Sequence, residues 1–112
     1  MSAIEVVQRQ LDAYNAHDLA GFTAAYSDAV EVFRMPSAAP AIAGKAQFAE
    51  FYASHRFNIP ELKAEVLNRM LLGGKIVDHE RIWGLGAAPI EAVAVYRVVD
   101  DLIDTVWFFY PD

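Results

Sequence analysis

The sequence predicts one α+β domain, in which helices come first and an antiparallel β-meander follows. Apolar residues recur at helical spacing in the first half of the chain. In the second half, two-residue turn signals separate runs rich in Val and Ile. A length of 112 residues suits a single domain over residues 1–112 and is too short for two.

A first helix is expected close to the start of the chain, because Ser2 and Glu5 form a capping-box pattern. Apolar residues at steps of three and four then share one face: Ile4, Val7, Leu11 and Tyr14. Asp18 is a suitable N-cap for a second, short helix over Leu19 to Tyr26. The N-terminal region is therefore predicted to be helical.

The middle of the chain predicts one strand and a third helix. Val30 to Met35 is rich in Val and Phe, which favours a strand. Pro36 and Pro40 then indicate a loop. The third helix is expected over Lys45 to Arg56, and Pro60 prevents its extension.

The second half of the chain predicts four strands: Leu62–Leu72, Lys75–Trp83, Ile90–Val99 and Leu102–Tyr110. Gly73-Gly74 and Asp100-Asp101 are two-residue hairpin signals. They predict four cross-strand pairs: Arg69 with Asp78, Asn68 with His79, Arg97 with Asp104 and Ala94 with Trp107. Two of these pairs place an Arg opposite an Asp, which cross-strand charge pairing favours.

Both faces of the last predicted hairpin are apolar. One face would carry Ala92, Ala94, Tyr96, Trp107 and Phe109. The other would carry Val93, Val95, Val106 and Phe108. Helices can cover only one of these faces, and an exposed apolar sheet face is typical of an interface. We therefore expect a homodimer that forms through the sheet.

The charge and composition exclude several classes of partner. The formal net charge is −6 and the sequence has no basic run, so we expect no binding to nucleic acid or to an anionic membrane. There are no cysteines, which excludes disulfides and thiolate chemistry. The N-terminus lacks a signal-peptide pattern and no segment is apolar enough to span a membrane. The expected location is the cytoplasm.

Four segments resemble the nuclear transport factor 2-like superfamily, in particular its SnoaL-like and ketosteroid-isomerase-like branches. They are L-D-A-Y-N-A-H-D-L-A-G-F (11–22), Y-S-D-A-V-E-V (26–32), I-A-G-K-A-Q-F (42–48) and V-W-F-F (106–109). The resemblance implies a cone-shaped, curved antiparallel or mixed sheet packed on three N-terminal helices, a cystatin-like α+β roll with an apolar pocket. It specifies the function poorly, because the superfamily includes isomerases, hydratases, cyclases and binding domains.

Ketosteroid isomerase chemistry requires a carboxylate base and two hydrogen-bond donors, a tyrosine and a protonated aspartic acid. The resemblance places the family's tyrosine at Gln10, its base at about Phe33 and its aspartic acid at Ala94. None of these three positions carries the family's side chain. Tyr14 lies one helical turn after Gln10 and is our candidate for the missing hydrogen-bond donor.

The run Asp78-His79-Glu80-Arg81 is the most polar part of the predicted sheet. In one arrangement His79 is a general base near neutral pH, and it faces the cavity together with Asn68, Tyr96 and Trp107. In the other arrangement Asp78 and Glu80 point inward, and Arg69 neutralises Asp78. Both arrangements stay open at the level of sequence.

The remaining candidate ligand-binding residues are Phe33, Arg34 and Tyr52. Arg34 is a candidate for holding an acidic ligand, and the aromatic residues are candidates for the cavity wall. The three His lack the spacing of metal ligands and no phosphate-binding Gly loop precedes a helix. We therefore expect neither a metal nor another cofactor.

Two functions follow from these observations. In the first, the domain binds a small apolar or aromatic molecule and acts as a cofactor-free isomerase, cyclase or dehydratase. Proton transfer then uses His79 or Glu80 as acid and base and Tyr14 as hydrogen-bond donor. In the second, it is a non-catalytic ligand-binding or dimeric interaction module.

Overall fold

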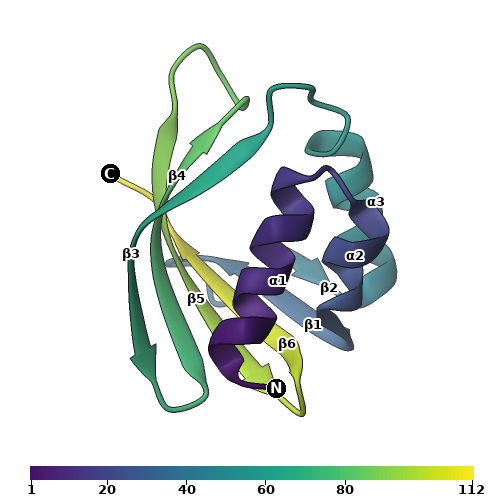
Figure 1. The fold of residues 1–112 in the computed structure, drawn as a ribbon. Helices are drawn as coiled ribbons and strands as arrows, with labels where there is room; N and C mark the ends of the chain where they lie inside the picture. The colour runs from purple at the N-terminus through teal and green to yellow at the C-terminus, as the bar shows by residue number, and fades with distance from the viewer.

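A computed structural model describes all 112 residues (Figure 1). The helices and strands, in chain order, are α1 (Ala3–Asn15), α2 (Leu19–Ala24), β1 (Tyr26–Arg34), β2 (Ile42–Ala43), α3 (Lys45–His55), β3 (Lys63–Leu72), β4 (Lys75–Trp83), β5 (Ile90–Val99) and β6 (Leu102–Phe109). None of the helices has the length and apolar character needed to cross a membrane.

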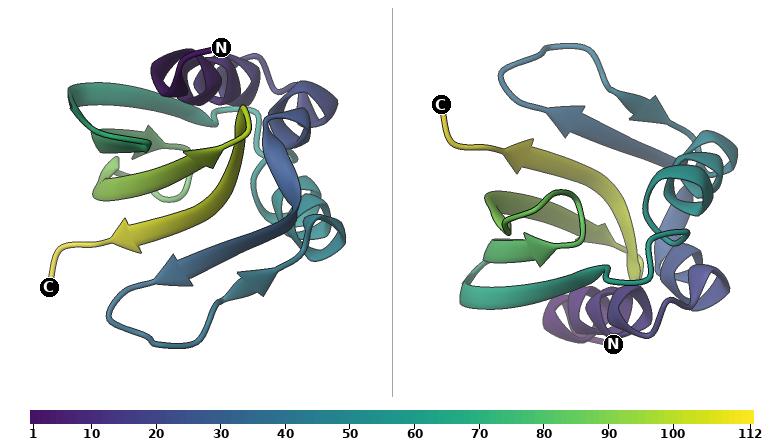
Figure 2. Two further views of the ribbon diagram at one scale, coloured as in Figure 1. Left: turned by 90° about the horizontal axis from the view of Figure 1, so that it is seen from below. Right: turned by 90° about the horizontal axis from the view of Figure 1, so that it is seen from above.

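The six strands form one mixed sheet in the order β2-β1-β6-β5-β4-β3. The contact of β1 with β6 is parallel, and the other neighbouring strands are antiparallel. The sheet is curved, and all three helices lie on one of its faces (Figures 1 and 2). This arrangement confirms the predicted α+β class.

The predicted helix caps form as hydrogen bonds. The Ser2 Oγ accepts from the Glu5 backbone N–H at 3.2 Å, and Glu5 Oε1 accepts from the Ser2 backbone N–H at 3.0 Å. Asp18 Oδ1 accepts from the backbone N–H of Gly21 at 3.0 Å. These bonds satisfy donors that have no partner inside the helix, and they confirm both predicted helix starts.

Aromatic rings fill much of the space between the helices and the sheet. Phe22 and Phe48 are almost fully buried, with ring centroids 5.5 Å apart. Phe22 also packs against Tyr14, Tyr26 and Tyr52 at centroid distances of 4.8–5.7 Å. This cluster joins all three helices to β1 and leaves only a small hollow in the cone.

The structure differs from the prediction around β1. The second helix ends at Ala24, and β1 begins at Tyr26 instead of Val30, because the Ile103 N–H donates to the Ala25 carbonyl at 2.9 Å and draws this segment into the sheet. The short strand β2 lies in a segment predicted to be a loop. It forms because Val32 accepts a backbone hydrogen bond at 2.8 Å from the residue before β2. Both differences depend on long-range pairing that local sequence does not reveal.

The predicted register of β3 with β4 is confirmed: Arg69 lies opposite Asp78, and Asn68 lies opposite His79. In the hairpin of β5 and β6, the turn at Asp100-Asp101 also forms, with positive φ at both residues. A β-bulge at Asp104 then shifts the pairing by one residue, so that Arg97 faces Thr105 instead of Asp104 and Ala94 faces Phe108 instead of Trp107.

This shift changes the composition of both sheet faces. The helix side carries Ala92, Ala94, Tyr96, Val106 and Phe108. The outer side carries Val93, Val95, Trp107 and Phe109. The prediction that Trp107 shares a face with Tyr96 is therefore wrong, and the reason is the extra residue in β6.

Candidate functional site

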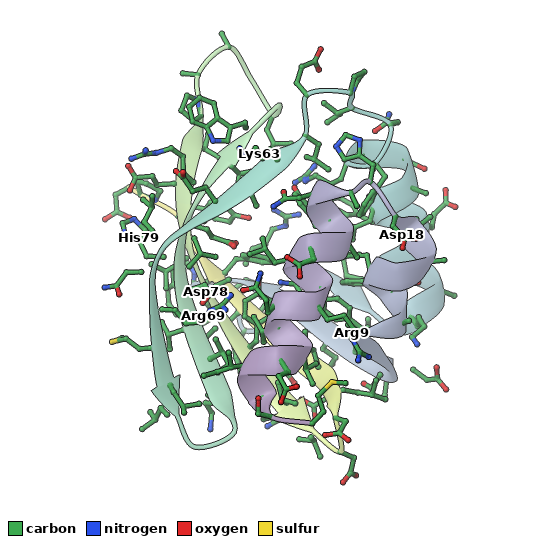
Figure 3. All side chains as sticks on the ribbon, in the orientation of Figure 1. Arg9, Asp18, Lys63, Arg69, Asp78 and His79 are labelled. Atoms are coloured by element: carbon green, nitrogen blue, oxygen red, sulfur yellow. The ribbon has the colours of Figure 1, made fainter.

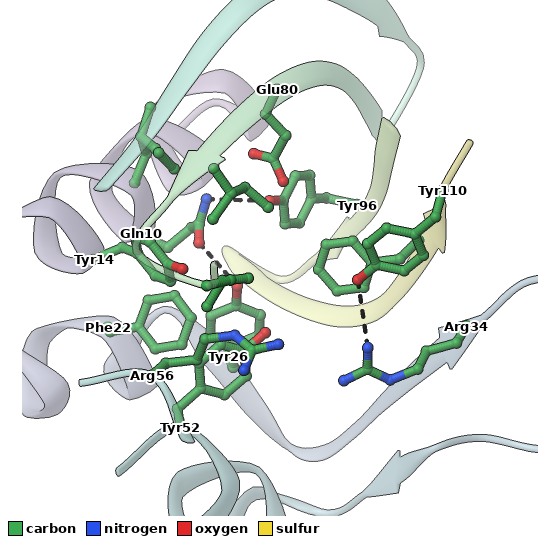
Figure 4. Close-up of a pocket in the computed structure, with 15 residues that line it drawn as sticks. Gln10, Tyr14, Phe22, Tyr26, Arg34, Tyr52, Arg56, Glu80, Tyr96 and Tyr110 are labelled. Carbon is green, nitrogen blue, oxygen red and sulfur yellow. Dashed lines mark hydrogen bonds between the residues drawn. The ribbon is translucent and has the colours of Figure 1, made fainter. Parts of the chain in front are cut away.

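A cavity lies between the three helices and the helix side of β4, β5 and β6 (Figure 4). Its volume is about 50 Å³, well below the roughly 150 Å³ of an apolar cavity that binds benzene. Its lining residues are Gln10, Leu11, Tyr14, Phe22, Tyr26, Arg34, Tyr52, Arg56, Ala64, Glu80, Ile82, Leu85, Tyr96, Phe108 and Tyr110. A ring-sized ligand would therefore lie partly in the mouth or displace side chains there.

Glu80 is the one carboxyl group in the cavity wall. Alternation along β4 puts it on the helix side of the sheet, where it is 5% exposed. It forms no hydrogen bond or ion pair with the protein. Burial, and then the nearby charge of Asp78, raise its pKa to about 8, while Arg69 acts in the opposite direction. Glu80 is therefore mostly protonated at neutral pH and close to the pH at which it gives up a proton.

Asp78 occupies the same face as Glu80 but has a dedicated partner. It is fully buried, and Arg69 donates to it through two nitrogens, Nε at 2.7 Å and Nη2 at 2.9 Å. The third donor, Arg69 Nη1, reaches Gln8 Oε1 on α1 at 2.9 Å. This confirms the arrangement in which Asp78 and Glu80 point inward and Arg69 neutralises Asp78.

Three polar side chains form a short hydrogen-bonded row in the cavity wall (Figure 4). The Tyr26 hydroxyl donates to Gln10 Oε1 at 2.9 Å, and Gln10 Nε2 donates to the Tyr96 hydroxyl oxygen at 3.5 Å. The Tyr96 hydroxyl thus serves as an acceptor and keeps its own proton available. Gln10 orients this row from the centre of the apolar face of α1.

Tyr14 and Tyr52 bring two further hydroxyl groups to the cavity. Neither hydroxyl forms a hydrogen bond inside the protein, and both residues line the cavity. Burial raises the pKa of both hydroxyls far above neutral. They therefore stay protonated and act as hydrogen-bond donors to a ligand, not as bases.

The mouth of the cavity is formed by lining residues that reach solvent: Arg34, Arg56, Leu85, Phe108 and Tyr110. Arg34 Nη1 donates to the Tyr110 hydroxyl at 3.4 Å. The Arg34 and Arg56 guanidinium carbons lie 5.5 Å and 5.0 Å from the centroid of the same ring, Phe51. One aromatic side chain thus supports both cations at the entrance.

Four of the candidate residues lie outside the cavity. His79 and Asn68 are on the outer face of the sheet, where His79 Nε2 lies 2.6 Å from Glu91 Oε1. Trp107 and Phe33 stack on each other at a centroid distance of 6.3 Å and are also absent from the cavity wall. Figure 3 shows His79 on one side of the sheet and Asp78 and Arg69 on the other. The predicted cavity face with Asn68, His79, Tyr96 and Trp107 together is therefore wrong, because successive residues of a strand point to opposite faces.

The other five candidates do meet in the cavity: Glu80, Tyr14, Tyr96, Arg34 and Tyr52. Among the polar residues of the cavity wall, sequence reasoning did not select Gln10, Tyr26, Arg56 and Tyr110. Gln10 had a usable signal, because it is a polar residue between Val7 and Tyr14 on an apolar helix face. Arg56 had none, since it follows the end of α3 and only the tertiary fold brings it to the mouth. No group of three or more His, Cys, Asp or Glu side chains is placed to hold a metal ion.

Known proteins with a similar sequence or a similar fold provide a comparison for this chain. The family model described as "SnoaL-like domain" matches residues 7–106. None of the curated protein sequences matches the chain significantly. This match confirms the SnoaL-like resemblance noted in the sequence, and several solved structures share the fold at low sequence identity.

One of these structures is a cystatin-fold protein from Novosphingobium aromaticivorans, with 23% identity, a TM-score of 0.86 and coverage of 96% of this chain and 97% of that one. A Δ5-3-ketosteroid isomerase from Mycobacterium sp. has 19% identity, a TM-score of 0.85 and coverage of 99% and 95%. A computationally designed 17-OHP binder has 17% identity, a TM-score of 0.86 and coverage of 100% and 94%. At these identities the likeness shows the fold alone.

Proposed function

The chain belongs to the SnoaL-like domain family, and from its cavity we propose that it binds a small, largely apolar molecule and moves a proton on it without a cofactor. The observation that carries this proposal is Glu80, a buried carboxyl group with no partner in the protein, in the wall of an aromatic cavity. An isolated buried carboxyl destabilises a fold, so its presence at a cavity is typical of a functional group.

Glu80 is suited to both directions of a proton transfer. With a pKa of about 8, both of its protonation states are populated near neutral pH, as acid–base catalysis requires. As a carboxylate it would take a proton from a carbon next to a carbonyl group. As a carboxylic acid it would return that proton to another carbon, which gives an isomerisation.

The negative charge that develops on the substrate oxygen needs a hydrogen-bond donor. Tyr14 is our candidate, because its hydroxyl reaches the cavity, stays protonated and has no partner in the protein. Tyr96 is a second donor, since Gln10 occupies its oxygen and leaves its proton available. This set differs from that of ketosteroid isomerase, whose three functional positions the sequence resemblance places at Gln10, at about Phe33 and at Ala94.

The test is isomerisation of the small probe cyclohex-3-en-1-one to its conjugated isomer, followed by ultraviolet absorption. Glu80→Gln keeps the shape of the side chain and removes its acidity, so we expect the rate to fall at least about 100-fold. Tyr14→Phe should lower the rate less, because Tyr96 remains. Glu91→Gln, on the outer face beside His79, is the matched control and should keep the wild-type rate. A wild-type rate in the Glu80→Gln protein would show that Glu80 takes no part in the reaction.

A second candidate function is ligand binding without turnover. It is favoured by the absence of a second carboxyl group from the cavity and by the unmatched family positions. In that case the probe would bind, and wild-type and Glu80→Gln proteins would both leave it unchanged.

We also propose that two copies associate through the outer face of the sheet, where Val77, Val93, Val95, Trp107 and Phe109 remain partly or fully exposed. The helices cover the other face, so this apolar surface has no partner within the chain. A cytoplasmic location stays a prediction from the sequence.

A further inference from the structure

Two arginines at the cavity mouth lack the acidic partner that the three arginines of β3, β4 and β5 have. Arg69, Arg81 and Arg97, all on the sheet, each pair with an Asp or a Glu. Arg34 and Arg56 are half-buried and have no carboxylate within ion-pairing distance. The chain has fifteen acidic residues for nine basic ones, so acidic side chains are plentiful but none is placed at this entrance.

The two guanidinium groups are held in position by aromatic contacts. Both lie over Phe51, and Arg34 also donates to Tyr110. Stacking of this kind fixes the plane of a guanidinium group. Arg56 Nη1 also donates to the His55 backbone carbonyl at 2.8 Å, and the remaining N–H donors of both groups have no partner in the protein. The remaining donors of the two oriented guanidinium groups match the oxygens of a carboxylate or a phosphate.

The positive charges of Arg34 and Arg56 act on side chains inside the cavity. The charge of Arg56 lowers the pKa of the Tyr14 and Tyr52 hydroxyls, and that of Arg34 lowers the pKa of Tyr52, although burial remains the larger influence on both tyrosines. Figure 4 shows both guanidinium groups on one side of the cavity and Glu80 on the other. A ligand spanning the cavity would thus meet cations at the mouth and the Glu80 carboxyl group inside.

We propose that the ligand of this cavity is a small organic acid whose oxyanion group is bound by Arg34 and Arg56 at the mouth and whose apolar part enters toward Glu80. This inference rests on the proposed function, because it assumes that the cavity binds a ligand. It adds the chemical class of that ligand, an organic anion with a carboxylate or a phosphate group.

The test compares benzoate with benzamide, which has the same ring and no charge. Binding is followed by ¹H–¹⁵N NMR titration of the whole chain at low ionic strength. We expect benzoate to bind at least five times more tightly than benzamide and to shift the signals of cavity residues. Phenyl phosphate provides a third arm, and tighter binding of it than of benzoate would identify a phosphate as the preferred oxyanion.

The variants Arg34→Gln, Arg56→Gln and their combination remove the charges and keep most of the side-chain stem. The double variant should lose the preference for benzoate while its affinity for benzamide changes less than twofold. Arg9→Gln, at an exposed position of α1 (Figure 3), makes the same change of net charge as each single variant and should behave as the wild type. If the double variant does not fold, the two single variants are compared with the wild type instead.

Two results would overturn the inference, and they differ in what they say of the proposed function. If benzamide binds in the cavity and benzoate binds no more tightly, or if the preference is undiminished in the double variant (in both single variants, should the double variant not fold), only the anionic ligand is ruled out. If neither compound shifts the signals of cavity residues, the binding function itself fails with it.

Discussion

Asp78 and Glu80 lie two positions apart on the same face of β4, but only one of these carboxyl groups has a partner. Asp78 is buried but receives two hydrogen bonds from Arg69, so its negative charge is compensated where it lies. Glu80 is almost as buried and receives none. Without compensation, burial favours the neutral form of a carboxyl group, and for this reason the pKa of Glu80 lies at about 8 while the Asp78 carboxylate is held in an ion pair.

This difference predicts an unusual dependence of stability on pH. The pKa of Glu80 is higher in the folded protein than the ordinary value of 4.5, so the folded state binds its proton more tightly than the unfolded state. The resulting stabilisation is complete below about pH 4.5 and is lost as the pH rises to about 8. Across this range the free energy of unfolding should fall by about 1.4 kcal/mol per pH unit from this group alone.

Urea unfolding of the wild type and Glu80→Gln between pH 5 and pH 9 measures this effect. The variant should lack the slope and be the more stable protein above pH 8. Glu91→Gln is the control, because hydrogen bonding to His79 lowers the pKa of Glu91 from an ordinary value that already lies below this range. Equal slopes in wild-type and Glu80→Gln proteins would contradict the raised pKa.

At the scale of strands, the turns could be predicted and the bulge could not. Gly73-Gly74 and Asp100-Asp101 determine where two hairpins fold back, and the register next to each turn is as expected. Asp104 gave no signal of its bulge: the expected ion pair with Arg97 forms at 2.8 Å, although Arg97 lies opposite Thr105 in the sheet. Alternation in β4 was equally ambiguous, since both of its faces combine polar and apolar residues.

The loop between β4 and β5 depends on Gly84, which precedes the cavity residue Leu85. Gly84 has a φ of +100°, and a Cβ atom there would lie 3.0 Å from the backbone of Glu61 and Leu62. Gly84→Ala should therefore lower the free energy of unfolding by at least about 1 kcal/mol. Gly86→Ala in the same loop meets only an ordinary contact at 3.9 Å and should change stability little; chemical denaturation compares the two. An equal effect of both substitutions would contradict this account of the turn.

For the whole molecule, the fold was predictable because its local signals agree with one another. Helix caps, Gly and Asp turns and the alternation of the last strands all indicate the same arrangement. The cavity was less predictable, because its volume depends on how rings such as Phe22 and Phe48 pack, and its mouth depends on Arg56, which only the tertiary structure brings there.

The proposed association of two copies also belongs to this scale. Val95 lies near the centre of the outer face of the sheet, so Val95→Lys should convert the dimer to a monomer in sedimentation velocity at micromolar concentration. Ile4→Lys, at an exposed position of α1 outside the sheet, should leave the dimer intact. A wild-type protein that sediments as a monomer would rule out this interface.

The state of the Glu80 carboxyl group is the central claim, and its titration tests that claim most directly. Carbon-13 labelling of glutamate side chains allows the Cδ signal of Glu80, assigned by its loss in Glu80→Gln, to be followed from pH 3 to pH 10. The structure predicts a midpoint of about 8. A midpoint near the ordinary 4.5 would mean that the group is hydrated or paired in solution, and the proposed acid–base role would then be wrong.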